Sequence, residues 1–193
     1  MGSVVADVAA EKAAWRARVL KGRAARAESL AEASARIVAR ARALPEVAEA
    51  GTVHLFWPLP GEVDLRPLAE ALHAEGRTVV LPAVAGPRAL AHRRFRGADA
   101  LVAGPFGVQE PGPEAGAIAP SAIDVVLVPG LGFGRDGSRL GWGGGYYDAF
   151  LGETDAARVG VAPSWAVVEA VPTAPHDARM RAVVTERGVI WTA

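Results

Sequence analysis

The chain has 193 residues, of which 51% are hydrophobic and 22% are charged, and its formal net charge is zero. This balance is typical of a globular protein with an apolar core and excludes a disordered chain. A neutral chain also lacks the basic excess that marks proteins binding nucleic acids or anionic membranes. Cysteine is absent, which excludes a disulfide framework, a thiolate nucleophile and a cysteine-based zinc site.

The N-terminal residues lack a basic segment followed by a long apolar stretch, so they do not predict a signal peptide. Pro and Gly interrupt the apolar runs before they reach the length that spans a membrane. We therefore expect a soluble cytoplasmic protein that binds neither nucleic acid nor membranes. The length favours one domain over residues 1–193, in which N-terminal helices at 8–43 pack on an α/β core.

Residues 8–43 contain no Pro and one Gly, Gly22, which predicts one or two amphipathic helices. An apolar stripe should face the core, and most charged residues should lie on a solvated face. The predicted stripe is Leu30, Ile37, Val38, Ala41 and Leu44. The predicted solvated residues are Arg23, Arg26, Glu32, Arg36 and Arg40.

After residue 43, short apolar runs alternate with helical segments. Strands are predicted at 52–57, 78–81, 90–95, 123–128, 158–162, 181–185 and 189–191. A helix is predicted from Asp64, as its N-cap, to Ala74, and a shorter one near 147–151, whereas 104–119 should be loop. Alternating strands and helices predict an α/β fold in three layers, with a mainly parallel sheet flanked by helices and an N-terminal helical segment.

Ligands of parallel sheets bind beyond the carboxyl ends of the strands, so the loops after Trp57, Leu81 and Val128 are candidate sites. The last of these loops opens a glycine-rich stretch at 130–145. Clustered glycines indicate either backbone N–H groups close to phosphate oxygens or a set of tight turns. The stretch contains a G-x-G-x-x-G match at 132–137, but no helix opens after it, and the chain has neither a Walker A loop nor a G-x-S-x-G elbow.

The end of this stretch carries residues that suit a phosphate site. Arg139 can clamp a phosphate, the N–H groups of residues 143–145 can approach it, and Asp148 can hold Mg²⁺. The alternative for Asp148 is a helix N-cap, and the alternative for Tyr146 and Tyr147 is packing in the core.

The same segment resembles the hallmark of the 5-formyltetrahydrofolate cyclo-ligase family, V-P-G-x-x-F-x-x-x-G-x-R-L-G-x-G-x-G-Y-Y-D. The matching residues are Val128-Pro129-Gly130, Phe133, Gly137, Arg139-Leu140-Gly141, Gly143, Gly145 and Tyr146-Tyr147-Asp148. Other family patterns follow the expected order: Lys12 and Arg16 on a helix, Gly61-Glu62-Val63-Asp64 after Trp57, residues 106–111, Val171-Pro172, His176-Asp177 and Val184-Thr185-Glu186. The basic segment 86–98 matches no family pattern.

The resemblance implies an α/β enzyme that uses ATP and Mg²⁺ to convert 5-formyltetrahydrofolate into 5,10-methenyltetrahydrofolate, releasing ADP and phosphate. It implies phosphorylation of the formyl oxygen, followed by attack of the N10 amine, and we expect a monomer. Two alternatives stay open: a related ATP-using enzyme acting on another pterin, and a non-catalytic α/β domain that binds a phosphorylated metabolite.

The resemblance also implies a set of site residues. Those implied to bind ATP are Lys12, Arg16, Arg139, Leu140, Gly141, Trp142, Gly143, Gly144, Gly145, Tyr146 and Tyr147. Those implied to bind the folate are Trp57, Glu62, Trp142, Gly143, Gly144, Gly145 and Tyr146. Asp148 and Asp177 are the implied Mg²⁺ ligands, and Arg139 and Tyr146 are implied to act in catalysis. For Lys12 and Arg16 the alternative is a pair of ordinary surface cations.

Overall fold

The computed structural model describes residues 2–24, 27–174 and 177–192, with side chains from residue 8 to 22 and from residue 30 onward within those ranges. Two helices form the N-terminal segment, α1 at Gly2–Ala24 and α2 at Ala27–Ala43. The apolar stripe predicted for α2 is confirmed, because Ile37, Ala41 and Leu44 are buried and Leu30 and Val38 pack against the same cluster.

The charged positions of α2 follow the prediction where the structure describes them. Glu32, Arg36 and Arg40 are exposed. The side chains of Arg23 and Arg26, and His176 of the C-terminal pattern, lie outside the described residues.

A seven-stranded sheet forms the centre of the fold, in the order β12-β11-β9-β6-β1-β2-β3. Neighbouring inner strands pair in parallel, and the edge strands β3 and β12 run antiparallel to their neighbours. The strands are β1 Thr52–His54, β2 Thr78–Gly86, β3 Ala89–Arg94, β6 Val125–Val128, β9 Ala157–Val161, β11 Ala182–Thr185 and β12 Gly188–Trp191. The predicted α/β fold with a mainly parallel sheet is confirmed.

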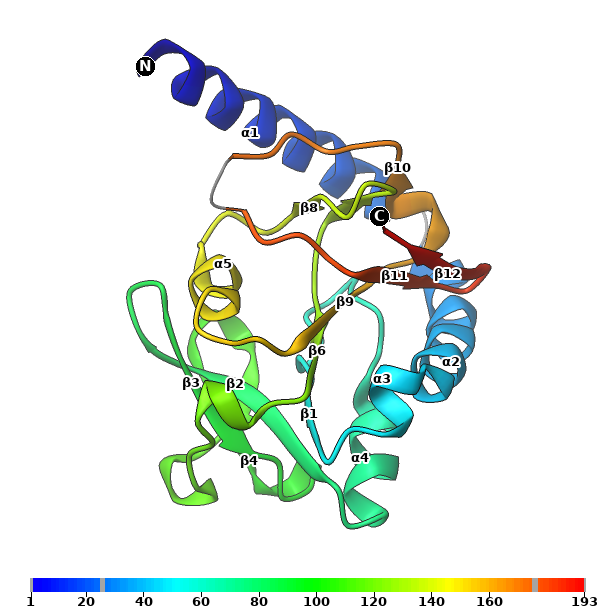
Figure 1. Cartoon of the computed structure of the whole chain (residues 1–193), viewed down its shortest axis with the longest axis vertical. Helices are drawn as coiled ribbons and strands as arrows, with labels where there is room; N and C mark the ends of the chain where they lie inside the picture. Colours follow the sequence, from blue (N-terminus) through cyan, green and yellow to red (C-terminus); the bar gives the residue numbers. More distant parts are fainter. Residues whose placement is uncertain (1, 25–26, 175–176, 193) are drawn as a thin grey trace.

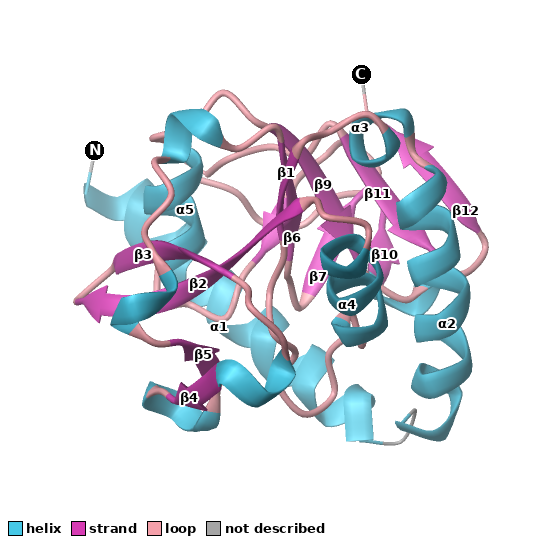
Figure 2. Ribbon diagram, turned by 90° about the horizontal axis from the view of Figure 1, so that it is seen from below, coloured by secondary structure: helices cyan, strands magenta, loops and turns pink. Residues whose placement is uncertain are grey.

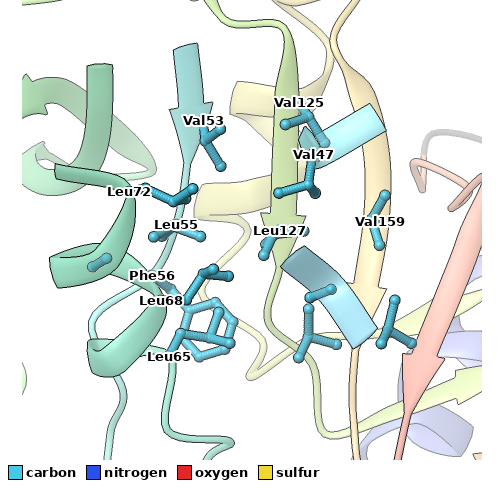
Figure 3. Packing of buried hydrophobic residues seen from close by; sticks show 14 of the residues in the cluster. Val47, Val53, Leu55, Phe56, Leu65, Leu68, Leu72, Val125, Leu127 and Val159 are labelled. Atoms are coloured by element: carbon cyan, nitrogen blue, oxygen red, sulfur yellow. The ribbon is translucent and has the colours of Figure 1, made fainter. Parts of the chain in front are cut away.

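Helices cover both faces of this sheet and give it three layers (Figures 1 and 2). One face carries α2, the short helix α3 at Pro45–Ala48, and α4 at Arg66–Ala74. Figure 3 shows side chains of α3 and α4 packed on those of β1, β6 and β9, all within one buried cluster. Every residue of β6 is buried, as expected of a strand covered on both faces.

The opposite face positions the glycine-rich stretch. Val126 and Val128 of β6 share a second buried cluster with Phe150 and Leu151 of α5, which spans Tyr146–Leu151. Beside α5, the glycine-rich stretch folds into a small sheet in the order β10-β7-β8. Its strands are β7 Gly132–Gly134, β8 Arg139–Leu140 and β10 Val167–Val168. Helix α1 lies against this small sheet through Trp15 and Val19.

Several predicted boundaries were wrong. The first strand ends at His54 rather than at residue 57, because the chain leaves the sheet toward a turn that contains two prolines. Segment 104–119 is not all loop, since β4 at Leu101–Ala103 pairs with β5 at Gln109–Pro111. Short 3₁₀ turns fill much of the remaining connections, at Ala98–Ala100, Pro105–Gly107, Pro113–Ala115, Pro120–Ala122 and Ser164–Ala166.

The N-cap predicted at Asp64 was also wrong, and the N-cap alternative for Asp148 does not hold. Helix α4 begins at Arg66 with Leu65 at its N-cap position, although Asp64 Oδ1 accepts a hydrogen bond of 3.0 Å from the Arg66 backbone N–H. From the position before the N-cap, Asp64 still does what an N-cap side chain does, because it accepts a hydrogen bond from a backbone N–H at the start of the helix. Gly145 holds the N-cap position of α5, so Asp148 lies in the first turn and its carboxylate engages another partner.

None of the helices in the described part of the chain has the length and apolar character required to span a membrane.

Candidate active site

An apolar cleft of about 900 Å³ opens between the loop after β1, the β2–β3 hairpin and the glycine-rich stretch. We call it the apolar cleft. Its walls are mostly hydrophobic, and a few polar side chains reach into it, which is the usual make-up of a small-molecule site. The lining residues are Phe56, Trp57, Leu59, Glu62, Pro82, Val84, Leu90, Val108, Pro129, Arg139, Gly141, Trp142, Gly143, Gly144, Gly145, Tyr146, Tyr147 and Asp148.

A second hollow of about 500 Å³ adjoins the apolar cleft, and we call it the cationic hollow. Its lining residues are Lys12, Arg16, Arg88, Arg139, Leu140, Gly141, Gly143, Gly145, Asp148 and Asp177. Four of these side chains are cations and two are carboxylates, so the hollow favours an anionic ligand. Arg139, Asp148 and part of the glycine-rich stretch line both spaces, which places the two hollows on either side of one loop.

The loop between the two hollows needs glycine at two positions for two reasons. Gly143 and Gly145 have φ of +104° and +72°, a backbone region that side chains with a Cβ rarely adopt. A Cβ at Gly143 would lie 3.3 Å from Arg16 Cζ, and a Cβ at Gly145 would lie 2.8 Å from Arg88 Nε. Glycine therefore lets the loop turn and also lets two guanidinium groups lie against its backbone.

Arg139 is the buried cation of the site. It is 5% exposed, and its Nη2 donates a hydrogen bond of 2.5 Å to Asp148 Oδ1. Its Nη1 lies 3.2 Å from the carbonyl oxygen of Pro129, at the carboxyl end of β6. These two contacts hold the Arg139 side chain in place, and the contact with Asp148 fixes the direction of that carboxylate. Arg139 also lines both hollows.

Lys12 and Arg16 reach the site from one face of α1. The Lys12 ammonium forms an ion pair with Asp177 and its side chain is 14% exposed, while Arg16 Nε donates a hydrogen bond of 2.9 Å to the carbonyl oxygen of Gly141. Neither is an ordinary surface cation. The spacing of four residues brings both groups to the same side of the helix, and there they attach α1 to the glycine-rich loop.

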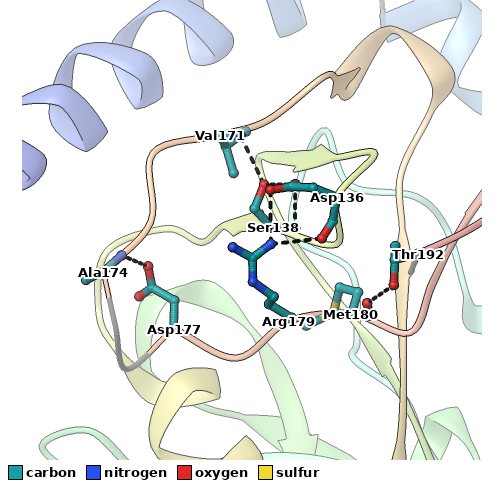
Figure 4. Close-up of polar contacts among 8 residues, drawn as sticks. All are labelled: Asp136, Ser138, Val171, Ala174, Asp177, Arg179, Met180 and Thr192. Atoms are coloured by element: carbon teal, nitrogen blue, oxygen red, sulfur yellow. Dashed lines mark hydrogen bonds and ion pairs between the residues drawn. The ribbon is translucent and has the colours of Figure 1, made fainter.

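The segment that carries Asp177 is anchored on both sides (Figure 4). Asp177 Oδ2 accepts a hydrogen bond of 2.6 Å from the backbone N–H of Ala174. Before it, the Val171 N–H donates to Ser138 Oγ at 3.0 Å, and after it Arg179 Nη1 lies 3.0 Å from Asp136 Oδ2. These contacts hold the Asp177 carboxylate over the hollow from a part of the chain that is remote in sequence.

Glu62 is the acidic group of the apolar cleft. It is 8% exposed; its Oε1 accepts a hydrogen bond of 2.8 Å from the Trp142 indole, and its Oε2 accepts one of 2.9 Å from the Leu59 N–H. Burial, and then the Glu62 charge, raise the pKa of Tyr147, so its hydroxyl stays protonated. That hydroxyl is buried without a hydrogen-bond partner among the described residues.

Comparison with known proteins shows the family of the chain. A family model described as the 5-formyltetrahydrofolate cyclo-ligase family matches residues 8–186. The chain belongs to this family. It is a family of ligases, and the sequence resemblance to it is thereby confirmed.

Individual members of the family are similar over most of the chain. The 5-formyltetrahydrofolate cyclo-ligase of Escherichia coli K12 is 32% identical over 169 residues, covering 84% of this chain and 93% of that protein. The enzyme of the same name from Mycolicibacterium smegmatis is 34% identical over 148 residues, covering 72% and 76%.

Solved structures of 5,10-methenyltetrahydrofolate synthetases share the fold. The Aquifex aeolicus protein superposes with a TM-score of 0.84 at 34% identity, covering 93% of this chain and 92% of the other. The Mycoplasma pneumoniae protein gives 0.74 at 23% identity, with 91% and 99% coverage, and supports the fold alone.

Every site residue expected from the cyclo-ligase resemblance lines one of the two hollows. Those on the cationic hollow alone are Lys12, Arg16, Leu140 and Asp177. Those on the apolar cleft alone are Trp57, Glu62, Trp142, Gly144, Tyr146 and Tyr147. Those on both are Arg139, Gly141, Gly143, Gly145 and Asp148. Their roles stay predictions.

The sequence did not indicate the contribution of the β2–β3 hairpin to this cyclo-ligase site. Val84 and Leu90 line the apolar cleft, and Arg88 at the hairpin tip lines the cationic hollow. Val108, from the connection after β4, completes the cleft. The one available signal was the basic segment 86–98, which matches no family pattern and so suggested no role.

A buried histidine pair packs against Phe150 of α5. His54 on β1 and His92 on β3 are 0% and 5% exposed, and Nε2 of the first lies 3.2 Å from Nδ1 of the second. The Phe150 ring lies 3.9 Å from the His92 ring, between centroids. Burial lowers the pKa of His54 well below its ordinary range, and the nearby His92 lowers it further; burial lowers the pKa of His92 to about 4. Both rings are therefore neutral in the folded protein at neutral pH.

Acidification from pH 7 to 5 should therefore destabilise the protein. In the unfolded chain each imidazole regains a pKa near 6.5 and binds a proton that the folded state excludes, so the free energy of unfolding falls as pH drops. We expect each of the two histidines to contribute a loss of about 1 kcal/mol per pH unit, measured by urea denaturation. In His92→Gln the slope should become shallower, whatever the variant's absolute stability; equal slopes in the two proteins would contradict this account.

Proposed function

We propose that this chain is an ATP-dependent 5-formyltetrahydrofolate cyclo-ligase that forms 5,10-methenyltetrahydrofolate and releases ADP and phosphate. The observation that carries the proposal is the arrangement of the two hollows. An apolar cleft holding a buried carboxylate meets a cationic hollow at one glycine-rich loop. A flat pterin suits the first and a polyphosphate suits the second, so the loop lies where the two substrates would meet.

The apolar cleft supports the binding of a folate. Trp57 and Trp142 supply flat apolar surface, and the Glu62 carboxylate is an acceptor for the N–H groups along a pterin edge. The leucine N–H and the indole that hold Glu62 fix its direction before a ligand arrives. The protonated Tyr147 hydroxyl is a donor that a ligand oxygen would satisfy.

The cationic hollow supports the binding of the ATP phosphates. Lys12 and Arg16 supply charge from α1, and the turns at Gly143 and Gly145 bring backbone N–H groups within reach of phosphate oxygens. Phosphoryl transfer requires placement and charge neutralisation more than covalent participation of the protein. A site without cysteine and without a nucleophile motif meets that requirement.

The same hollow fits Mg²⁺ bound together with phosphate. Asp148 and Asp177 are its two carboxylates, and no group of three or more His, Asp or Glu suited to a metal occurs among the described residues. Mg²⁺ commonly takes one or two protein carboxylates and completes its shell with phosphate oxygens and water. Asp148 and Asp177 would hold it, and when bound it would neutralise charge on the phosphate oxygens.

The proposed chemistry has two steps. The γ-phosphoryl group leaves ADP and forms a new P–O bond with the formyl oxygen of 5-formyltetrahydrofolate. The N10 amine then attacks the formyl carbon, the C–O bond breaks, phosphate departs and the N10 proton is released. Phosphorylation is needed because a formamide oxygen is otherwise a poor leaving group. Arg139 keeps Asp148 aimed at the hollow, and Tyr146, which lines the cleft, lies on the folate side.

Release of ADP tests this proposal. Purified protein with MgATP should release ADP only when 5-formyltetrahydrofolate is added, one ADP for each folate consumed. ADP release stimulated by a different pterin, and not by this folate, would identify a related enzyme. Tight nucleotide binding with no turnover would point to a non-catalytic binding domain. The expectations of one domain, a monomer and a cytoplasmic location stay predictions.

A further inference from the structure

The tip of the β2–β3 hairpin lies against the glycine-rich loop. Gly86 pairs with Ala89, so the turn consists of Pro87 and Arg88. Figure 1 shows this hairpin in green, rising beside α5. The Arg88 Nε would lie 2.8 Å from a Cβ at Gly145, which means that the guanidinium rests directly on the loop backbone. The Arg88 side chain, at the tip of the hairpin, thus lines the cationic hollow.

The backbone of Arg88 is in a conformation that arginine rarely adopts. Its φ is +57°, and Phe106 is the other non-glycine residue with a positive φ in the described ranges. A turn with Pro at the first central position and a positive φ at the second usually has Gly or Asn there. Strain of this kind gathers where a side chain serves a ligand or a mechanism. Glycine would remove the strain but would also remove the guanidinium, so the strained backbone indicates that the Arg88 side chain has a function.

Arg88 also differs from the other cations of the hollow in its contacts. Lys12 pairs with Asp177, and Arg139 pairs with Asp148. Arg16 Nε donates to the Gly141 carbonyl oxygen. By contrast, Arg88 makes no hydrogen bond or ion pair with any residue that the structure describes. It is the cation of the hollow whose donors are all available to an incoming anion.

We propose that Arg88 binds the polyphosphate of ATP and is a further binding residue of the nucleotide site. This inference rests on the proposed function. Arg88 lines the cationic hollow and is not among the residues of the apolar cleft, so the phosphates are the anion within its reach rather than a carboxylate of the folate. Val84 and Leu90 of the same hairpin line the cleft, so one hairpin touches both substrates.

Replacement of the side chain should weaken nucleotide binding selectively. In Arg88→Ala the KM for ATP should rise by about 10- to 100-fold, because a charge-assisted bidentate contact is lost. The KM for 5-formyltetrahydrofolate should stay within about twofold of wild type. Arg88→Lys should fall between the two, since lysine supplies a point charge without the planar fork. Arg96→Ala is the matched control, an exposed arginine of the same basic segment outside both hollows.

Arg88→Gly separates binding from structure. Glycine adopts φ near +57° without strain, so this variant should unfold at the same or a higher temperature than wild type while binding ATP as weakly as Arg88→Ala. A raised KM for the folate with an unchanged KM for ATP would overturn the proposal, and so would an Arg88→Ala protein that behaves like Arg96→Ala.

Calorimetric titration with Mg²⁺ and the non-hydrolysable analogue AMP-PNP makes the test independent of turnover. Wild type should bind the analogue at least about tenfold more tightly than Arg88→Ala. If wild type binds the analogue more tightly than Arg88→Ala but makes no methenyl product, the proposed function fails and the role of Arg88 stands. If product forms and the two proteins bind the analogue equally, the role of Arg88 fails and the proposed function stands.

Discussion

Replacement of Asp148 by Asn is expected to reduce kcat by about 100-fold or more while the protein still folds. Asparagine keeps the size of the side chain but removes the charge that would hold Mg²⁺ beside the phosphates. The concentration of Mg²⁺ that gives half-maximal activity should rise as well. Initial rates over a Mg²⁺ series, followed through ADP release, measure both effects.

The same substitution leaves the buried Arg139 without its 2.5 Å carboxylate partner, so some loss of stability is also expected. A thermal melt separates this loss from catalysis. Asp155→Asn is the matched control, because Asp155 is exposed and lies outside both hollows. If Asp148→Asn melts at a lower temperature but keeps the wild-type Mg²⁺ dependence, Asp148 has a structural role and holds no metal.

Replacement of Glu62 by Gln should raise the KM for 5-formyltetrahydrofolate with little change in the KM for ATP. A hydrogen bond to a charged group contributes about 1.5–3 kcal/mol, so kcat/KM for the folate should fall by about 10- to 100-fold. Glutamine has one acceptor oxygen, and it cannot serve the Leu59 N–H, the Trp142 indole and a pterin edge as the carboxylate can. Steady-state kinetics with each substrate varied in turn gives the two KM values.

Trp142→Phe provides a second check on Glu62, in which an aromatic ring stays in the apolar cleft. Loss of the indole N–H removes the 2.8 Å hydrogen bond that fixes Glu62, so folate binding should weaken in this variant too. Glu32→Gln is the control, since its carboxylate is 80% exposed on α2. Equal increases in both KM values for Glu62→Gln would mean that the substitution disturbs the whole loop, and the assignment of Glu62 to the folate would be wrong.

The sheet could be predicted from sequence because its inner strands are continuous apolar runs, as at Val125–Val128. The length of β2 could not. The strand was predicted to end at Leu81, yet β2 continues through Pro82 to Gly86. β1 has ended by that point, so Pro82 pairs with His92 on one side only and its missing N–H costs no hydrogen bond there. This depends on the partner strands and not on the local pattern.

The candidate site likewise has a part that could be predicted from local sequence and a part that could not. Lys12, Arg16, Glu62 and the glycine-rich loop could be predicted as site residues, because each belongs to a short motif whose residues are close together in the sequence. The partners of these residues come from far along the chain: Lys12 meets Asp177, and Glu62 meets Trp142. Arg88 escaped prediction because turn rules place glycine or asparagine at its φ. Long-range pairing and a strained backbone are properties of the folded chain.

The most direct test of the account is the absorbance of the methenyl product when the purified protein is mixed with MgATP and 5-formyltetrahydrofolate. The conjugated methenyl bridge absorbs where the formyl substrate does not. The account predicts a band that grows only when both substrates are present and that fails to grow with Asp148→Asn. Well-folded wild-type protein that produces no band with both substrates present would contradict the proposed reaction.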